Sequence, residues 1–332
     1  MTGRTDAAHL APSRSTPPGG SPATEAGRIA GAGTDPDRPV AAVLAAALHL
    51  PGVDLPDLAG LPGGGAGSWA ADEEPACPPE RAADLLGRKG LLAKEPATRL
   101  ALCAVHRTLG LPPKAPRRTG PADPRTAVVV SSNLGNVATV GDIARRLREG
   151  GLREVGPLEA PNASSNVIAG AIAIWFRFGG PNLTVCSGAT AGLDAIWLAG
   201  LLLRTGRADR VVVVGTEPDD PQAQALHAAR EGAVAGRPLR AGAACLLLGP
   251  VDAPQRPLAL LGPVRTGVPV DGPPHAPLVD STVLAGDHYG AAGVVHTALA
   301  VRLSGGEATS VTVRCGDPVD GVRELSVLAA RR

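Results

Sequence analysis

The stretch GPNLTVCSGATAGL, residues 180–193, decides how this chain of 332 residues is expected to fold. Leu183–Cys186 is apolar and β-branched, which is typical of a short strand. Ser187-Gly188 forms a tight turn, and a helix of small and apolar residues follows from about Thr190 to Leu203. This order places a turn side chain at a helix N-terminus, where unpaired N–H groups and the helix dipole stabilise an anion.

The helix after this turn is apolar nearly all round, with leucines, Ile196 and Trp197 on every face. A helix of this kind is buried on all sides, so we expect it between two sheets. Its longest apolar run, Ala195–Leu203, is far below the roughly 18–20 residues that a membrane helix needs. The sequence therefore predicts no membrane association and a cytoplasmic location.

Strands and helices alternate from Arg125 onward, which indicates an α/β protein with a mixed sheet. The predicted strands, besides Leu183–Cys186, are Thr126–Ser131, Arg210–Gly215, Ala243–Leu248, Ser310–Arg314 and Glu324–Leu328. The predicted helices, besides the one described above, are Glu95–Leu109, Gly141–Arg148, Asn162–Phe178 and Gly290–Leu303. Residues 1–37 are rich in Pro, Gly, Ser and Thr without periodicity, so we expect a disordered tail there.

Composition excludes several function classes. Lys and Arg number 32 and Asp and Glu 31, and the chain holds three Trp, one Tyr and two Phe, so no basic, aromatic surface for nucleic acid is indicated. The five cysteines are scattered and form no CxxC pair, which argues against a disulfide framework or a zinc site. The run Gly63–Gly65 follows no strand and is not a phosphate-binding loop. No cofactor and no metal is expected.

Four segments, taken in order, resemble the β-ketoacyl synthases. They are VVVSSNLG at 128–135, the run from Pro161-Asn162 to Ile172-Ala173-Ile174, GPNLTV at 180–185 with its turn and helix, and GDHYGAAG at 286–293. The resemblance implies a thiolase-like α-β-α-β-α layered fold made of two similar halves. Residues 38–250 are then the N-terminal ketosynthase-like half, and residues 251–332 a truncated C-terminal half. It also implies a dimer, and an acyl-cysteine attacked by a malonyl unit on acyl carrier protein.

The residues that carry this chemistry in the family are missing or displaced here. Ala189 stands at the position of the nucleophilic cysteine, and a methyl group cannot attack a thioester. Cys186, three residues earlier, is interpreted as a small buried apolar side chain, with a nucleophilic role as the alternative. No segment resembles the family's Asn-Ala-His-Gly-Thr element. Asp287 occupies the position of the second histidine, and a one-residue slip would realign His288 instead.

Other polar residues have plainer interpretations. Asp219-Asp220 is expected in a solvated loop, and His227, His275 and His296 are interpreted as ordinary surface or core residues. No catalytic residue is therefore assigned. The candidate positions are Ala189, Cys186 and His288.

Three functions remain open. The first is a non-catalytic partner subunit similar to a chain-length factor, working with a catalytic ketosynthase subunit and acyl carrier protein as a hetero- or homodimer. The second is an acyltransferase or decarboxylase that keeps activity through other residues. The third is a self-associating scaffold, which would be favoured if Ala189 lined no cavity.

Overall fold

The computed structural model describes residues 38–54, 58, 61, 75–157, 159–233, 236–274, 276–303 and 310–330. The predicted tail at 1–37 and the run Gly63–Gly65 lie outside these residues. Residues 36–332 form one compact unit, which contains both predicted ketosynthase-like halves. Among the described helices, none has the length and apolar character required to cross a membrane.

The strands form one mixed sheet with the order β3-β2-β4-β5-β1-β6-β10-β9-β8, and β7 pairs with β10. β2 is parallel to β3 and β4, whereas β5, β1, β6 and β10 join through antiparallel pairs. The strands are β1 (Ala41–His49), β2 (Thr126–Ser131), β3 (Asn182–Val185), β4 (Arg210–Glu217), β5 (Gly242–Gly249), β6 (Ala259–Leu261), β7 (Arg265–Thr266), β8 (Leu278–Val279), β9 (Ser310–Asp317) and β10 (Gly321–Ala329).

The helices confirm the predicted ones and add others. They are α1 (Ala82–Leu86), α2 (Pro96–Thr108), α3 (Val137–Gly150), α4 (Val167–Phe176), α5 (Ala191–Arg204), α6 (Pro221–Ala229), α7 (Thr282–Ala285) and α8 (Ala292–Leu303), with short 3₁₀ turns that include η5 (Gly188–Thr190) and η6 (Tyr289–Ala291). The prediction at Gly141–Arg148 was too short, because α3 begins four residues earlier. α4 begins five residues later than predicted, after the turn η4 (Ala160–Ala163).

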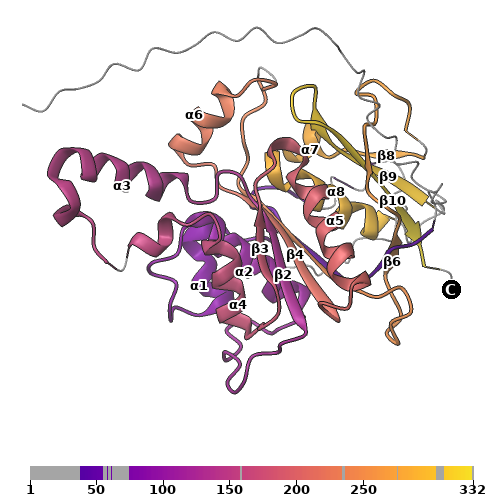
Figure 1. The fold of residues 1–332 in the computed structure, drawn as a ribbon, viewed down its shortest axis with the longest axis horizontal. Helices are drawn as coiled ribbons and strands as arrows, with labels where there is room; N and C mark the ends of the chain where they lie inside the picture. The colour runs from indigo at the N-terminus through magenta and orange to yellow at the C-terminus, as the bar shows by residue number, and fades with distance from the viewer. Residues whose placement is uncertain are drawn as a thin grey trace, which may run out of the picture. The chain divides into compact units, whose positions relative to one another are not determined.

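Alternating side chains of the central strands separate two hydrophobic cores. Val128 and Val130 of β2 face α2 and α4, whereas Val129 faces the pair α5 and α8. The same α5–α8 core takes in Val313 of β9 and Leu325 of β10. Figure 1 shows α5 and α8 running between β2–β4 and β8–β10. The layers are therefore helices, sheet, helices and sheet, with the two sheet layers formed by the two ends of one continuous sheet. They correspond to four of the five layers that the resemblance implies.

The central helices approach each other very closely at two glycines. A Cβ on Gly192 of α5 would lie 2.6 Å from the backbone nitrogen of Gly293 in α8. No side chain larger than hydrogen fits at this crossing, which explains the small residues in both helices.

The outer face of β9 and β10 carries a loop where a fifth layer of helices was expected. Of the described helices, α5 and α8 share one hydrophobic core with these two strands. On the outer face, Arg314 donates to the Gly272 carbonyl at 2.8 Å and pairs with Glu324, which also pairs with Arg265. This polar cover agrees with a shortened C-terminal half, because few apolar side chains need covering there.

The expectation that the α5 helix is buried on every side was wrong along one side, where Trp197 and Arg204 are exposed and Leu201 is half-buried. Leu193 and Ile196 are buried in the α5–α8 core, but Trp197 is 50% exposed. α8 and the strands cover the remaining sides of the helix and leave the Trp197 side open.

Candidate functional site

Ala189 lies at the N-terminal end of the central helix, inside the turn η5 that leads into α5. Its backbone N–H donates to the Asp320 carboxylate at 2.7 Å, and Asp320 comes from the hairpin between β9 and β10. Gly188 has φ +67°, and a Cβ there would collide with that carboxylate. The anion-stabilising end of the helix is therefore occupied by a carboxylate of the chain itself.

Two polar side chains, Asp194 and Asn133, brace this turn. Asp194, one turn into α5, accepts hydrogen bonds from the Ser187 and Thr190 hydroxyls at 2.6 and 2.7 Å. Asn133 closes the turn from the end of β2, donating to the Gly188 carbonyl and accepting from its N–H. The turn is thus held by side chains from two other parts of the fold.

Glu217 binds the backbone of the loop that carries Asn133. Its fully buried carboxylate accepts hydrogen bonds from the N–H groups of Asn133 and Leu134 at 2.7 and 3.0 Å and from the Ser132 hydroxyl. Burial raises the pKa of Glu217 to about 8, although these hydrogen bonds and one from the Gly290 N–H act in the opposite direction.

A cleft of about 210 Å³ opens beside Ala189. Its polar lining side chains are Arg230, Arg237, Asp280, Thr282, Asp287, Tyr289, His296, Arg314, Cys315 and Asp317. This volume is below the roughly 300–1,000 Å³ of ligand pockets for drug-sized molecules. Arginine and aspartate residues line the cleft, so the methyl group of Ala189 borders a polar cavity.

Asp287 lines this cleft at the position expected for the second family histidine. Its carboxylate pairs with Nε2 of His227 at 3.2 Å and with Arg230 at 3.7 Å. Burial alone would raise the pKa of Asp287, but hydrogen bonds from His227 and from the Tyr289 N–H, with the Arg230 charge, bring it below the usual value. The residue beside Ala189 is therefore an anion.

His288 points elsewhere. It does not line the cleft beside Ala189 but packs against Gly242, where a Cβ would lie 3.3 Å from its Nε2. It is 3% exposed, and neither ring nitrogen makes a hydrogen bond to the described residues. Burial lowers the pKa of His288 to about 4, so the ring is neutral near pH 7.

His296 of α8, which the sequence analysis interpreted as an ordinary surface or core residue, lines the cleft. Its Nε2 accepts a hydrogen bond from the Ser281 N–H at 3.4 Å, and it lies 3.7 Å from the Asp280 carboxylate. Burial lowers the pKa of His296, although Asp280 acts against this. No local motif marks this histidine, because its side chain reaches the cleft from the middle of a buried helix. His275 lies outside the described residues.

The interpretation of Cys186 as a buried apolar side chain was wrong. It follows β3 directly and is exposed, with its thiol donating to the Ser132 carbonyl at 3.1 Å. Its remaining burial and the Glu217 charge raise the pKa of the thiol, which therefore stays protonated near neutral pH. Cys186 is exposed because the chain leaves the strand at the edge of the sheet.

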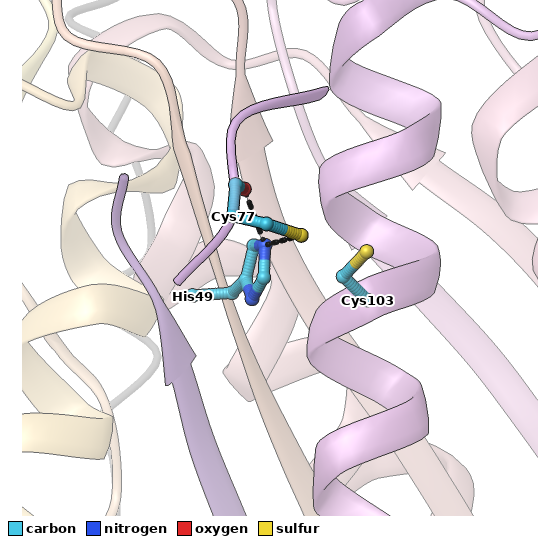
Figure 2. Close-up of side chains that lie close together, drawn as sticks. All are labelled: His49, Cys77 and Cys103. Carbon is cyan, nitrogen blue, oxygen red and sulfur yellow. Dashed lines mark hydrogen bonds between the residues drawn. The ribbon is translucent and has the colours of Figure 1, made fainter. Parts of the chain in front are cut away.

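A second cluster, formed by His49, Cys77 and Cys103, lies away from this cleft. Its donor atoms, one from each residue, all lie within 4.8 Å of one another (Figure 2). The scattered cysteines without a CxxC pair indicated no zinc site, but these three residues are 28 and 26 positions apart and meet only in the folded chain. To find this cluster from the sequence, one would need to know that β1 packs against α2.

Residues 81–241 match the family model described as the β-ketoacyl synthase N-terminal domain. Over this stretch the chain resembles the β-ketoacyl synthases. A stretch of 92 residues is 34% identical to 3-oxoacyl-[acyl-carrier-protein] synthase 2 of Rhizobium meliloti, and 93 residues are 32% identical to the synthase 2 of Vibrio cholerae. Each match covers 28% of the ketosynthase-like chain and 22% of the relative.

Solved structures share the fold of the ketosynthase-like chain over most of its length. The ishigamide ketosynthase/chain length factor aligns with a TM-score of 0.67 and 22% identity, over 88% of this chain and 99% of that one. A type II PKS acyl-carrier protein in complex with its ketosynthase aligns with a TM-score of 0.63 and 15% identity, over 88% and 100%. These similarities establish the thiolase-like fold of ketosynthases and chain-length factors.

Proposed function

We propose that this ketosynthase-like chain is a non-catalytic partner subunit of a condensing enzyme in polyketide or fatty-acid-type biosynthesis. The observation that carries the proposal is the pair Ala189 and Asp320. The nucleophile position holds a methyl group, and its backbone N–H already donates to the Asp320 carboxylate. A thioester carbonyl that gains negative charge in its reaction would need this donor, and a carboxylate in its place repels that charge.

The surrounding residues support the same conclusion. Condensation in the family uses two histidines, but the first histidine segment has no counterpart in the sequence and Asp287 lines the cleft at the second position. The turn is nevertheless fully braced by Asn133 and Asp194. A fold that keeps its packing without its reactive groups is what a partner subunit requires.

The partners that we propose are a cysteine-bearing ketosynthase subunit and acyl carrier protein. Two structural neighbours support them, since one is a ketosynthase/chain length factor and the other a carrier protein bound to its ketosynthase. A dimer and a cytoplasmic location remain predictions from the sequence.

The test is co-expression of the full chain with the cysteine-bearing ketosynthase encoded nearest to its gene. We expect the two to co-purify as a defined complex by light scattering, and carbon–carbon bond formation to require the cysteine of the partner only. A monodisperse monomer that ignores the partner would contradict the proposal.

An alternative activity rests on the exposure of Cys186, which makes its thiol accessible to an acyl donor. Incubation with malonyl-carrier protein, followed by intact mass, tests it directly. An acyl adduct that disappears in Cys186→Ala would favour the acyltransferase reading over the partner subunit.

A further inference from the structure

We propose that His49, Cys77 and Cys103 form a binding site for a thiophilic closed-shell metal ion, and that Zn²⁺ is the ion that this donor set fits best. The three residues come from three parts of the fold. His49 ends β1, Cys77 lies in the segment before the turn η2 (Pro79–Arg81), and Cys103 is in the middle of α2. The site is separate from the cleft beside Ala189 and does not depend on the proposed function.

The geometry is close to that of a zinc shell. Nε2 of His49 lies 3.8 Å from Sγ of Cys77, and all three donor atoms fall within 4.8 Å. Zinc bonds of about 2.3 Å to sulfur and about 2.0–2.1 Å to nitrogen place tetrahedral ligands roughly 3.4–3.8 Å apart. Figure 2 shows the His49 ring and the two thiols facing one another between β1 and α2. Small side-chain rotations would bring all three onto one ion.

The chemistry of the donors also suits a cation. Two cysteine thiols and one imidazole are ligands that Zn²⁺ commonly takes in proteins. Metal binding would displace the protons of both thiols, and two thiolates with one Zn²⁺ give a neutral buried site. Such neutrality matters because an unpaired buried charge is costly.

His49 can supply its lone pair after a change of tautomer and a rotation of its ring away from the Cys77 carbonyl. At present Nε2 donates to the Cys77 carbonyl at 2.9 Å, while the buried Nδ1 makes no hydrogen bond to the described residues. Moving the proton to Nδ1 leaves the Nε2 lone pair free for the metal. This tautomer change requires no ring flip.

The three protein ligands leave a fourth position, which a water molecule takes in many zinc sites. Cys77 is partly exposed, so this position faces the solvent side of the cluster. The ion would join the segment around Cys77 to β1 and α2 and close the 28-residue connection from His49. We therefore expect an anchoring role, in which the metal stabilises the fold by binding the native state alone.

The competing chemistry for two adjacent thiols is a disulfide between Cys77 and Cys103. All five cysteines are free in this structure, and a disulfide would leave His49 without a role in the cluster. The metal site accounts for all three residues. The test must nevertheless distinguish the two.

The experiment uses the full chain purified under reducing conditions without chelator and loaded with Zn²⁺. We expect about one Zn²⁺ per chain by elemental mass spectrometry, and an intense thiolate-to-cobalt charge-transfer band when Co²⁺ is used instead. Cys77→Ser should weaken Zn²⁺ binding at least tenfold in a chelator competition, whereas Cys186→Ser, which alters an exposed thiol outside the cluster, should leave it unchanged.

A cobalt spectrum without thiolate bands, or equal zinc affinity in Cys77→Ser and the parent, would overturn the proposal. So would a Cys77–Cys103 disulfide in peptide mass spectra of protein purified without reductant, combined with no zinc uptake after reduction. If Cys77→Ser fails to fold, chelator added to the zinc-loaded parent provides the second measurement. We expect the chelator to lower its melting temperature, and no shift contradicts the anchoring role.

Discussion

The backbone N–H of Ala189 and the carboxylate of Asp320, 131 residues apart in the sequence, form a hydrogen bond of 2.7 Å at the N-terminal end of the central helix. This end of a helix attracts anions, and the chain fills it from its own β9–β10 hairpin. The position that we propose for the nucleophile therefore holds an alanine at a helix end that a carboxylate of the same chain occupies.

The first prediction concerns restoring the nucleophile. Ala189→Cys alone should give no condensation product, because Asp320 still occupies the N–H and Asp287 lies beside the cleft in place of a histidine. Product formation from acyl- and malonyl-carrier protein, followed by mass spectrometry, measures this. A condensing activity from that single substitution would show that the cleft has been misread.

The second prediction concerns the reactivity of the thiol introduced by Ala189→Cys. Adding Asp320→Asn should speed its alkylation by iodoacetamide at pH 7, since removing the adjacent charge favours the thiolate at the helix end. Peptide mapping separates this thiol from Cys186. Asp252→Asn, at an exposed loop position, is the matched control and should leave the rate unchanged.

The third prediction concerns the stability that Asp320 confers. Asp320→Asn should lower the free energy of unfolding by about 0.3–1 kcal/mol, because a charge at the helix N-terminus is lost. Urea denaturation at low ionic strength measures this difference. High salt should shrink it, since screening weakens the dipole interaction, and a salt-independent loss would point to a packing effect.

The fourth prediction concerns pH and Glu217. Its pKa is raised from 4.5 to about 8 in the folded chain, so between these values the folded state holds more protons than the unfolded state. Its contribution to stability is present at low pH and is lost as the pH rises toward 8. Glu217→Gln should therefore lose less stability than the parent between pH 5 and 8 in urea denaturation. Glu80→Gln, at an exposed site, should behave as the parent does.

The fifth prediction concerns the crossing of α5 and α8. Gly192→Ala should destabilise the chain by about 1–3 kcal/mol, because the added methyl group meets the backbone of Gly293. Gly170→Ala is the control within another helix, α4, where a Cβ has open space, and it should be neutral or stabilising. Similar losses at both positions would mean that the close contact has no special cost.

The elements built from local patterns were predictable. β2 matches its predicted range, and α2, α5 and β10 lie close to theirs, because alternating or helical burial is written directly into the residues of each segment. β1 was not indicated. Its sequence AAVLAAALH is rich in alanine, which favours a helix, and it becomes a strand because β5 and β6 pair with both of its edges.

The candidate site also combines a feature that the sequence shows with contacts that only the folded chain shows. The sequence alone identified Ala189 at the turn before a buried helix, because the nucleophile segment is continuous in the chain. Only the tertiary structure brought Asp320 to Ala189, placed Asp287 beside the cleft, and joined His49 to Cys77 and Cys103. Contacts of this kind carry no local periodicity. They depend on how whole strands and helices pack, and that packing is decided by the burial of many side chains together.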